Sequence, residues 1–337
     1  MINALRERKI GKLIPKILVM IGCLAIPFPI FVAEDLKTTP RRLTLQVTKD
    51  LPGDQCRRIA TPNTKPSLPV SLHRTFQDDF DEHPLKDGKW VPHYAGSIVR
   101  PESFYAGGDG SDFHRKTEFN GEQQIYVDPI YAGRGSVPLG LDPFRVRHGV
   151  LAIAATRTPP PLNAVLFNNE YVSGILTTQK SFSQKYGYFE IRAKIPAGVG
   201  VWPAFWLLAD NGGWPPEIDA MEGRGQQPGV LAMTTHWRSP ATGFVQTCGF
   251  DFVVPDASIK FHDYGVLWTP SQIVHFIDRK PVSEMNVPAG FVDPMYMIVN
   301  LAMGAKNFAG VGFVNADSPD VVEFEIDRIS AYQIDSF

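Results

Sequence analysis

The sequence predicts an all-β protein built as an antiparallel β-sandwich. From Thr75 onward, short segments of strand character are interrupted by Gly, Pro and Asp, and no amphipathic helical stripe exceeds two turns. The 29 glycines and 29 prolines among 337 residues supply the many turns that such a fold needs. Many short strands separated by turn signals favour a single sandwich of about 265 residues.

Individual strands can be placed from their patterns. Residues 188–195 alternate apolar with polar side chains, which predicts one buried face and one face in water. Residues 295–303 are continuously apolar and predict a central strand covered on both faces. The tripeptide Asp278-Arg279-Lys280 is typical of a hairpin tip between two strands.

Residues 1–33 have the composition of an export segment. Five basic residues and one acidic residue within 1–16 precede the uncharged apolar stretch 17–33. A 17-residue helix is about 25 Å long, which is short for a bilayer, and Pro27 and Pro29 weaken its second half. We therefore expect an exported protein, periplasmic or extracellular, whose segment is a signal peptide or an uncleaved membrane anchor. A lipid-modified Cys23 is a weaker alternative, because the apolar run continues past it.

Residues 34–70 contain five prolines and little periodic apolar pattern, which predicts a linker ahead of a folded domain at 71–337. Without residues 1–33 the chain has 28 basic and 34 acidic residues, a net charge of −6 that disfavours nucleic acid as a partner. Cys56 and Cys248 then remain. They form a disulfide or stay two unrelated thiols, and the sequence leaves both alternatives open.

A cluster of acidic residues marks the candidate chemistry. Glu217 and Asp219 share one face of a regular strand, and a β-bulge at Ala220-Met221 would bring Glu222 to the same face. The two glutamates would then be about 13 Å apart at their Cα atoms, and about 5 to 6 Å apart at their carboxyl groups. That separation is typical of a retaining glycosidase, whereas an inverting enzyme needs a wider gap to admit a water molecule.

The segment 186–225, YGYFEIRAKIPAGVGVWPAFWLLADNGGWPPEIDAMEGRG, resembles glycoside hydrolase family 16. Five further blocks agree in order: FQDDFD (76–81), NGEQQIY (120–126), FHDYGVLWT (261–269), PMYMIVNLAMG (294–304) and FEIDRISAYQ (324–333). The resemblance covers about residues 75–335. It implies a jelly-roll sandwich of two curved antiparallel sheets, as in concanavalin A-like lectins and glucanases, with an open cleft that hydrolyses internal β-linkages of polysaccharides.

The resemblance also implies roles for the three acids. Glu217 would be the nucleophile, Glu222 the general acid and base, and Asp219 their hydrogen-bonding neighbour. The physical chemistry is compatible with these roles, because three carboxyl groups on one strand face cannot all ionise at low cost and one proton is retained.

Side chains for substrate binding follow from the same resemblance, since aromatic rings line the cleft of the family and stack on sugar rings. The expected residues are Trp206, Trp214, His236, Trp237, Asn120 and Phe308. Trp202 is assigned to the core. Phe308 stands where the family has a late Gly-Gly-x-Trp pattern, because this chain reads Gly-Ala-Lys-Asn-Phe at 304–308. This departure predicts altered sugar binding there.

No cofactor is expected to be required for catalysis. Asp79 and Asp327 resemble the positions of a structural calcium ion in the family, although calcium prefers six to eight oxygen ligands and two acids supply few of them. We expect a monomer.

The predicted activity is an exported, endo-acting, retaining glycoside hydrolase. Its polysaccharide substrate would be a β-1,3-glucan, a mixed-linkage β-1,3/1,4-glucan or a glucan-containing exopolysaccharide. Two alternatives stay open: a transglycosylase, which passes the covalent intermediate to a sugar hydroxyl, and a non-catalytic carbohydrate-binding protein. Other hydrolase motifs, such as Gly-x-Ser-x-Gly and His-Glu-x-x-His, are absent from the sequence.

Overall fold

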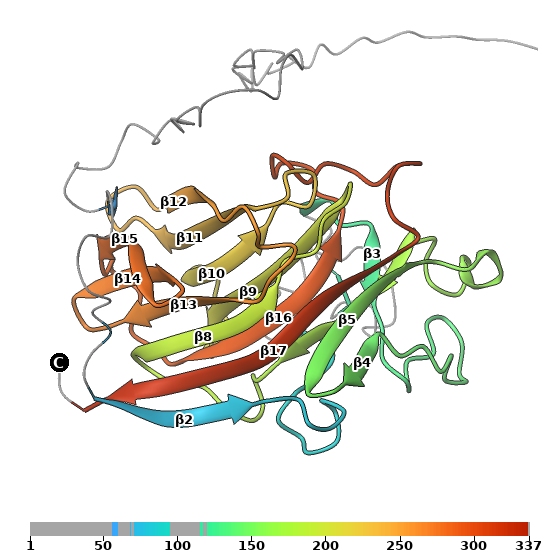
Figure 1. The fold of residues 1–337 in the computed structure, drawn as a ribbon, viewed down its shortest axis with the longest axis horizontal. Helices are drawn as coiled ribbons and strands as arrows, with labels where there is room; N and C mark the ends of the chain where they lie inside the picture. The colour runs from blue at the N-terminus through green and yellow to red at the C-terminus, as the bar shows by residue number, and fades with distance from the viewer. Residues whose placement is uncertain (1–55, 60–67, 69–70, 95–114, 117–119, 336–337) are drawn as a thin grey trace, which may run out of the picture. The chain divides into compact units, whose positions relative to one another are not determined.

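A computed structural model describes residues 56–59, 68, 71–94, 115–116 and 120–335. Within these residues the chain forms two β-sheets packed against each other (Figure 1). Residues 1–33, the predicted export segment, lie outside the described residues. In the described part of the chain, no helix has the length and apolarity needed to cross a bilayer. One short 3-10 helix, η3, spans Pro160–Leu162.

The larger sheet contains eleven strands of the described chain. They are β1 (Cys56–Arg58), β2 (Leu72–Asp78), β3 (Gln124–Tyr126), β4 (Phe144–Arg147), β5 (Val150–Arg157), β6 (Tyr171–Ser173), β8 (Gly187–Lys194), β13 (His262–Trp268), β14 (Gln272–Ile277), β15 (Lys280–Asn286) and β17 (Val321–Ile334). Their order is β1-β15-β14-β13-β8-β17-β5-β6-β3, with β2 also paired to β17 and β4 to β5. The pairings are antiparallel except for β3 with β6, which is parallel and departs from the expected pattern.

The second sheet contains six strands, all paired antiparallel. They are β7 (Ile175–Thr177), β9 (Val201–Ala209), β10 (Glu217–Gly223), β11 (Val230–Arg238), β12 (Val245–Val253) and β16 (Met295–Met303). Their order is β12-β11-β10-β9-β16-β7, so the acidic strand β10 lies inside the sheet between β9 and β11 (Figure 1). The two sheets confirm the predicted all-β sandwich.

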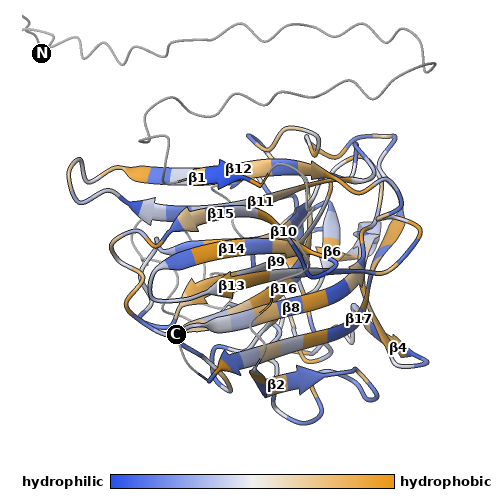
Figure 2. Ribbon diagram, turned by 60° about the vertical axis from the view of Figure 1, so that its left-hand side comes forward, coloured by the Kyte–Doolittle hydropathy of each residue, from blue (hydrophilic) through white to orange (hydrophobic). Residues whose placement is uncertain are grey.

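The hydrophobic core lies between the sheets and takes alternate residues from each. Phe189 and Ile191 of β8 pack in the same cluster as Phe205 and Leu207 of β9. Figure 2 shows the alternation of apolar and polar positions along β8. Strand β16 is buried at every position, as its continuous apolar sequence predicts. Burial of apolar surface is the main stabilising contribution in such a core, and it contributes about 25 cal/mol per Å².

The outer face of β8 differs from the prediction. Tyr188 and Glu190 were expected in water, but both are buried. The predicted hairpin tip is confirmed: the chain turns from β14 to β15 through Asp278 and Arg279, which have left-handed φ angles. Arg279 reaches Glu190 with two hydrogen bonds of 2.9 and 2.8 Å. A salt-bridged hairpin therefore covers the polar face of the strand.

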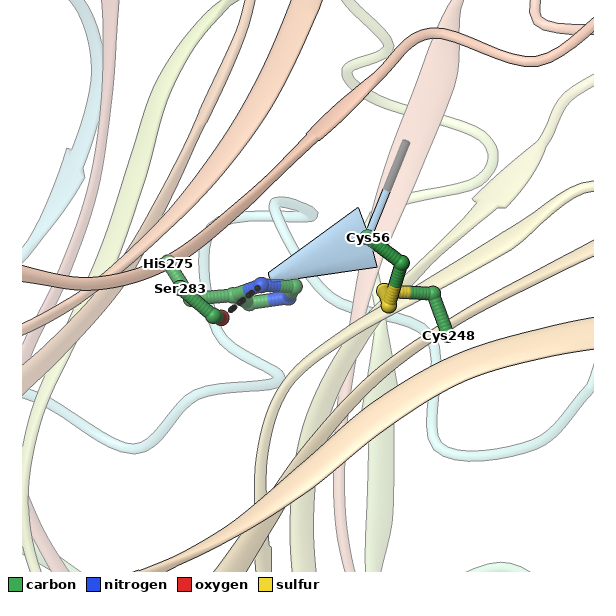
Figure 3. The surroundings of a disulfide bond; sticks show 4 residues. All are labelled: Cys56, Cys248, His275 and Ser283. Atoms are coloured by element: carbon green, nitrogen blue, oxygen red, sulfur yellow. Dashed lines mark hydrogen bonds between the residues drawn. A yellow bond between two sulfur atoms is a disulfide. The ribbon is translucent and has the colours of Figure 1, made fainter. Parts of the chain in front are cut away.

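Cys56 and Cys248 form a disulfide, with Cα atoms 6.0 Å apart. Strand β1 pairs with β15, and Cys248 lies in β12, so the bond joins an edge strand of one sheet to an edge strand of the other. Figure 3 shows the hydrogen-bonded pair His275 and Ser283 in its surroundings. The structure thus decides between the two alternatives for the cysteines. It also corrects the linker, because residues 56–58 belong to a sheet.

Candidate active site

A β-bulge in β10 gathers the three acids. Asp219 pairs with Thr234 of β11, and Glu222 pairs with Ala232, so three steps along β10 match two steps along β11. Ala220 and Met221 both lie in the core, which takes up the extra residue. Glu217, Asp219 and Glu222 therefore share the outer face of the six-stranded sheet, and the predicted bulge is confirmed.

Neutral donors hold both glutamates. Trp214 donates its indole N–H to Glu217 Oε2 at 2.9 Å, and Trp202 donates its indole N–H to Glu222 Oε1 at 3.2 Å. The Thr234 hydroxyl lies within hydrogen-bond distance of Asp219 Oδ2 and of Glu222 Oε2, the latter at 3.2 Å. Because a hydroxyl donates one hydrogen, Thr234 bonds one of these carboxylates at a time.

His236 supplies the positive charge of the site. Its Nε2 lies 3.3 Å from Asp219 Oδ2 and 3.8 Å from Glu217 Oε1, while its Nδ1 contacts Thr247 Oγ1 at 2.8 Å. Burial lowers the pKa of His236, but the hydrogen bond and charge of Asp219 and the two glutamates outweigh it and raise the pKa to about 9. The ring is therefore an imidazolium at neutral pH.

The pKa values of the two glutamates are also raised, which favours their neutral form, whereas the raised pKa of His236 favours its charged form. Burial, followed by the negative charge of Asp219, raises the pKa of Glu217 and the pKa of Glu222 to about 8 each, while the charge of His236 lowers both. Groups that interact this closely titrate as one unit. The pair therefore keeps a proton at neutral pH, which gives the site an acid beside a carboxylate.

Two of the predicted aromatic residues lie beside the acids. Trp206 pairs across the sheet with Asp219 and donates its N–H to Asn300 Oδ1 at 2.8 Å. Trp214 is 42% exposed, and its ring centroid lies 6.4 Å from that of His236. Both rings are partly accessible beside the row of carboxyl groups of Glu217, Asp219 and Glu222, which we call the carboxylate row. A sugar can stack there.

The assignment of Trp202 to the core is wrong. Trp202 alternates with the buried Val201 and Pro203, and it lies on the same face as Trp206 because strand residues two apart share a face. Its ring packs on Phe308, with centroids 5.0 Å apart and planes 31° from parallel. The structure thus brings Phe308 beside the acids, and it adds Trp202 to the site.

The assignment of Trp237 to substrate binding is also wrong. Trp237 is 7% exposed and belongs to the core cluster. Its neighbour His236 faces the acids, and successive strand residues point to opposite faces. The two residues could not both lie on the face that carries the acids.

The remaining predicted residues lie elsewhere. Asn120 is half-buried, and its carbonyl accepts a hydrogen bond from the backbone N–H of Lys306, in the segment that leads to Phe308. Asp327 pairs with Arg192 at 3.2 Å, and Asp79 accepts a hydrogen bond from Gln77. Calcium binding by the two aspartates stays a prediction.

Potential metal ligands meet at one place in the described residues. Single ligand atoms of Glu217, Asp219 and His236 lie within 4.8 Å of one another. The imidazolium form of His236 is an ion-pair partner, whereas a metal ligand must be a neutral imidazole. The contacts of the three residues are accounted for by hydrogen bonds and charge.

Sequence reasoning missed Thr234, which joins two of the acids. An isolated threonine gives no signal along the chain, because its partners lie 15 and 12 residues away. The position of Trp202 could have been predicted from the sequence, because strand alternation with a period of two places Trp202 on the same face as Trp206.

Comparison with known proteins supports the geometry. The model of glycosyl hydrolases family 16 matches residues 147–311. The chain is 40% identical over 266 residues to the endo-1,3-1,4-beta-glycanase ExsH of Rhizobium meliloti (strain 1021), covering 79% of this chain and 52% of that protein. It is 31% identical to a glucan endo-1,3-beta-glucosidase of Cryptopygus antarcticus, covering 63% of this chain and 82% of that protein.

A solved structure gives the same result. The laminarinase from Rhodothermus marinus is 28% identical and aligns with a TM-score of 0.58, covering 78% of this chain and 98% of that chain. This likeness confirms the predicted jelly-roll sandwich. The chain spans about half the length of the rhizobial relative. From the relative in Cryptopygus, most of which the chain covers, and from the matching fold, it follows that the chain belongs to glycosyl hydrolase family 16.

Proposed function

We propose that this protein is an exported, endo-acting, retaining β-glucanase that cleaves internal β-1,3 or β-1,3/1,4 bonds of a polysaccharide. The observation that carries the proposal is the bulge of β10, which places Glu217 and Glu222 on one face, with the Thr234 hydroxyl within reach of Asp219 and Glu222 between the strands. The activities for which two relatives are named, endo-1,3-1,4-beta-glycanase and glucan endo-1,3-beta-glucosidase, support the substrate class.

The contacts of the two glutamates support different roles. Each glutamate accepts one indole N–H, but of the two only Glu217 forms an ion pair with the His236 imidazolium, at 3.8 Å, so Glu217 is the better stabilised anion and the nucleophile. Glu222 keeps the proton. Asp219 holds the imidazolium at 3.3 Å and, by its charge, raises the pKa of Glu222.

The reaction then proceeds in two displacements. Glu217 attacks the anomeric carbon, the glycosidic C–O bond breaks, and the departing oxygen takes the proton of Glu222. Water replaces the departed sugar, Glu222 removes one proton from it, and the resulting hydroxide breaks the bond between the anomeric carbon and Glu217. Both glutamates return to their starting states, and the anomeric configuration is retained.

The aromatic residues support endo-cleavage. Trp214 bonds the carboxylate of Glu217, and Trp202, on which Phe308 packs, bonds that of Glu222. Stacking surfaces thus flank both ends of the carboxylate row. A polymer can be held on both sides of the bond that breaks, which an enzyme acting on chain ends does not need.

The disulfide supports export. Disulfides form and persist in oxidising compartments outside the cytoplasm, and Cys56–Cys248 joins two sheets of the domain. A periplasmic or extracellular location fits a polymer substrate that cannot enter the cell.

Azide rescue tests the two roles. Glu222→Ala should lose about 10²- to 10⁴-fold in kcat on polysaccharide, but keep the first step on an aryl glycoside whose leaving group needs no proton. Azide should then give a β-glycosyl azide with Glu222→Ala and an α-glycosyl azide with Glu217→Ala. The exposed Glu82→Ala is the matched control and should retain full activity. Full activity of Glu222→Ala on polysaccharide, or the same azide anomer from both variants, would refute the assignment.

A further inference from the structure

The outer face of the larger sheet has a hollow that the proposed reaction does not use. It has a volume of about 520 Å³ and is lined by Arg74, Gln77, Arg192, Asp263, Arg279, Arg328 and Tyr332. We call it the arginine hollow. It lies on β2, β8, β13 and β17 and the hairpin tip, whereas the three acids lie on the outer face of the other sheet. The core separates the two sites.

The register of the strands creates the hollow. A middle row runs through Ser330, Glu190 and Gly265, which pair directly across β17, β8 and β13. Gly265 has no side chain, and a Cβ there would meet the Tyr188 hydroxyl at 2.4 Å. The row on one side carries arginines, and the row on the other side carries Tyr332. The Tyr188 side chain covers Gly265, and the hollow opens between the arginines and Tyr332.

The charges do not balance within the hollow. Glu190 accepts two hydrogen bonds from Arg279, and Arg328 contacts Asp263 at 3.4 Å and Glu190 at 3.8 Å. The third acid, Asp327, pairs with Arg192. Four arginines therefore face three acids. Among the described residues, Arg74 has no ion-pair partner.

The donors that remain suit a carboxylate. Arg279 uses only its Nε and one terminal nitrogen on Glu190 and is 46% exposed, so its other terminal nitrogen faces solvent. A guanidinium binds a carboxylate through parallel N–H donors. Tyr332 is half-buried and pairs across the sheet with Arg74, which places an aromatic surface beside the free guanidinium.

We propose that the arginine hollow is a second glycan-binding site, which takes a carboxylate-bearing sugar of an acidic polysaccharide. The carboxylate would bind Arg74 and the free edge of Arg279, and the apolar face of the ring would lie on Tyr332. Such a site would hold an acidic chain on the face opposite the acids. It does not depend on the catalytic roles of Glu217 and Glu222.

Titration calorimetry with a β-1,4-linked glucuronate hexamer tests the proposal. The full chain carries Glu217→Gln, so that no turnover occurs. We expect the hexamer to bind and Arg74→Gln to weaken binding about tenfold, as loss of a charge-assisted hydrogen bond predicts. The matched control is Arg147→Gln, which removes the same charge from β4 of the same sheet. It should leave the affinity unchanged. Neutral laminarihexaose should bind equally well with and without Arg74→Gln.

Three outcomes would overturn the proposal. Equal weakening by Arg74→Gln and Arg147→Gln would show an unspecific effect of net charge. Unchanged affinity in Arg74→Gln, with a normal circular dichroism spectrum, would place the hexamer elsewhere. If acetate bound as tightly as the hexamer, the hollow would take free anions rather than a glycan.

Discussion

His236 shows how one residue sets the chemistry of its neighbours. Its imidazolium lies between Asp219 and Glu217 and lowers the pKa of both Glu217 and Glu222, against the larger effects of burial and of Asp219. Thr247 holds the ring from the other side. Both glutamates thus depend on the same cation, although neither forms a hydrogen bond with it.

Removal of this cation should shift the pH profile of kcat/KM to higher pH. In His236→Gln, the pKa of Glu217 and the pKa of Glu222 should rise further, by about one unit. The acidic limb, which needs ionised Glu217, and the alkaline limb, which needs protonated Glu222, should both shift to higher pH. The profile of wild type and variant on laminarin measures this. The control is His262→Gln, which removes a histidine from β13, and its profile should not move.

At the scale of the element, β10 depends on one extra residue. The strand starts with Glu217 outward and would turn Glu222 into the core without the bulge. Ala220 and Met221 both point inward and are fully buried, which shows where the alternation is interrupted. One residue of the strand therefore decides whether the site has one glutamate or two.

Deletion of Ala220 and Met221 together should abolish activity. Glu222 would then follow Asp219 directly, and because successive strand residues point to opposite faces, its carboxyl group would enter the core, at a cost of several kcal/mol. We expect loss of soluble protein, or folded protein with at least about 10³-fold lower activity, measured by near-ultraviolet circular dichroism and glucan hydrolysis. Deletion of Ala241, in the exposed turn between β11 and β12, is the control and should be tolerated. A fully active variant that lacks both Ala220 and Met221 would contradict the role given to the bulge.

At the scale of the molecule, the disulfide connects the two layers at their edges. Strand β1 extends the larger sheet next to β15, and Cys56 bonds to Cys248 in β12. Thr247, the partner of His236, is the residue next to Cys248. The disulfide that joins the sheets is therefore adjacent in sequence to a residue that holds His236.

Loss of the disulfide should lower stability more than activity. The bond joins residues 192 positions apart, and the chain-entropy estimate for such a loop is about 5 kcal/mol. We expect Cys56→Ser with Cys248→Ser to lower the free energy of unfolding in urea by up to that amount. Reduced wild type should unfold like the double variant, and a reductant should not change the variant further. Equal stability of oxidised wild type and double variant would refute this expectation.

Local patterns in the sequence were sufficient to predict the fold class and the three acids of the site, and they also predict the export segment. These features are local. Alternation with a period of two marks a strand, and acids at fixed spacing on one strand face outward together once a bulge is placed. The family resemblance added the jelly roll and the aromatic residues Trp206, Trp214 and Phe308.

The contacts between residues on different strands became known only from the three-dimensional structure. Thr234, Trp202 and the arginine hollow depend on the register between β10, β9 and β11 or between β8, β13 and β17. The same holds for the pairing of Cys56 with Cys248 and for the burial of Trp237. In a sheet, neighbours in space are set by hydrogen-bond pairing between distant segments, and a single residue's type does not encode its partner.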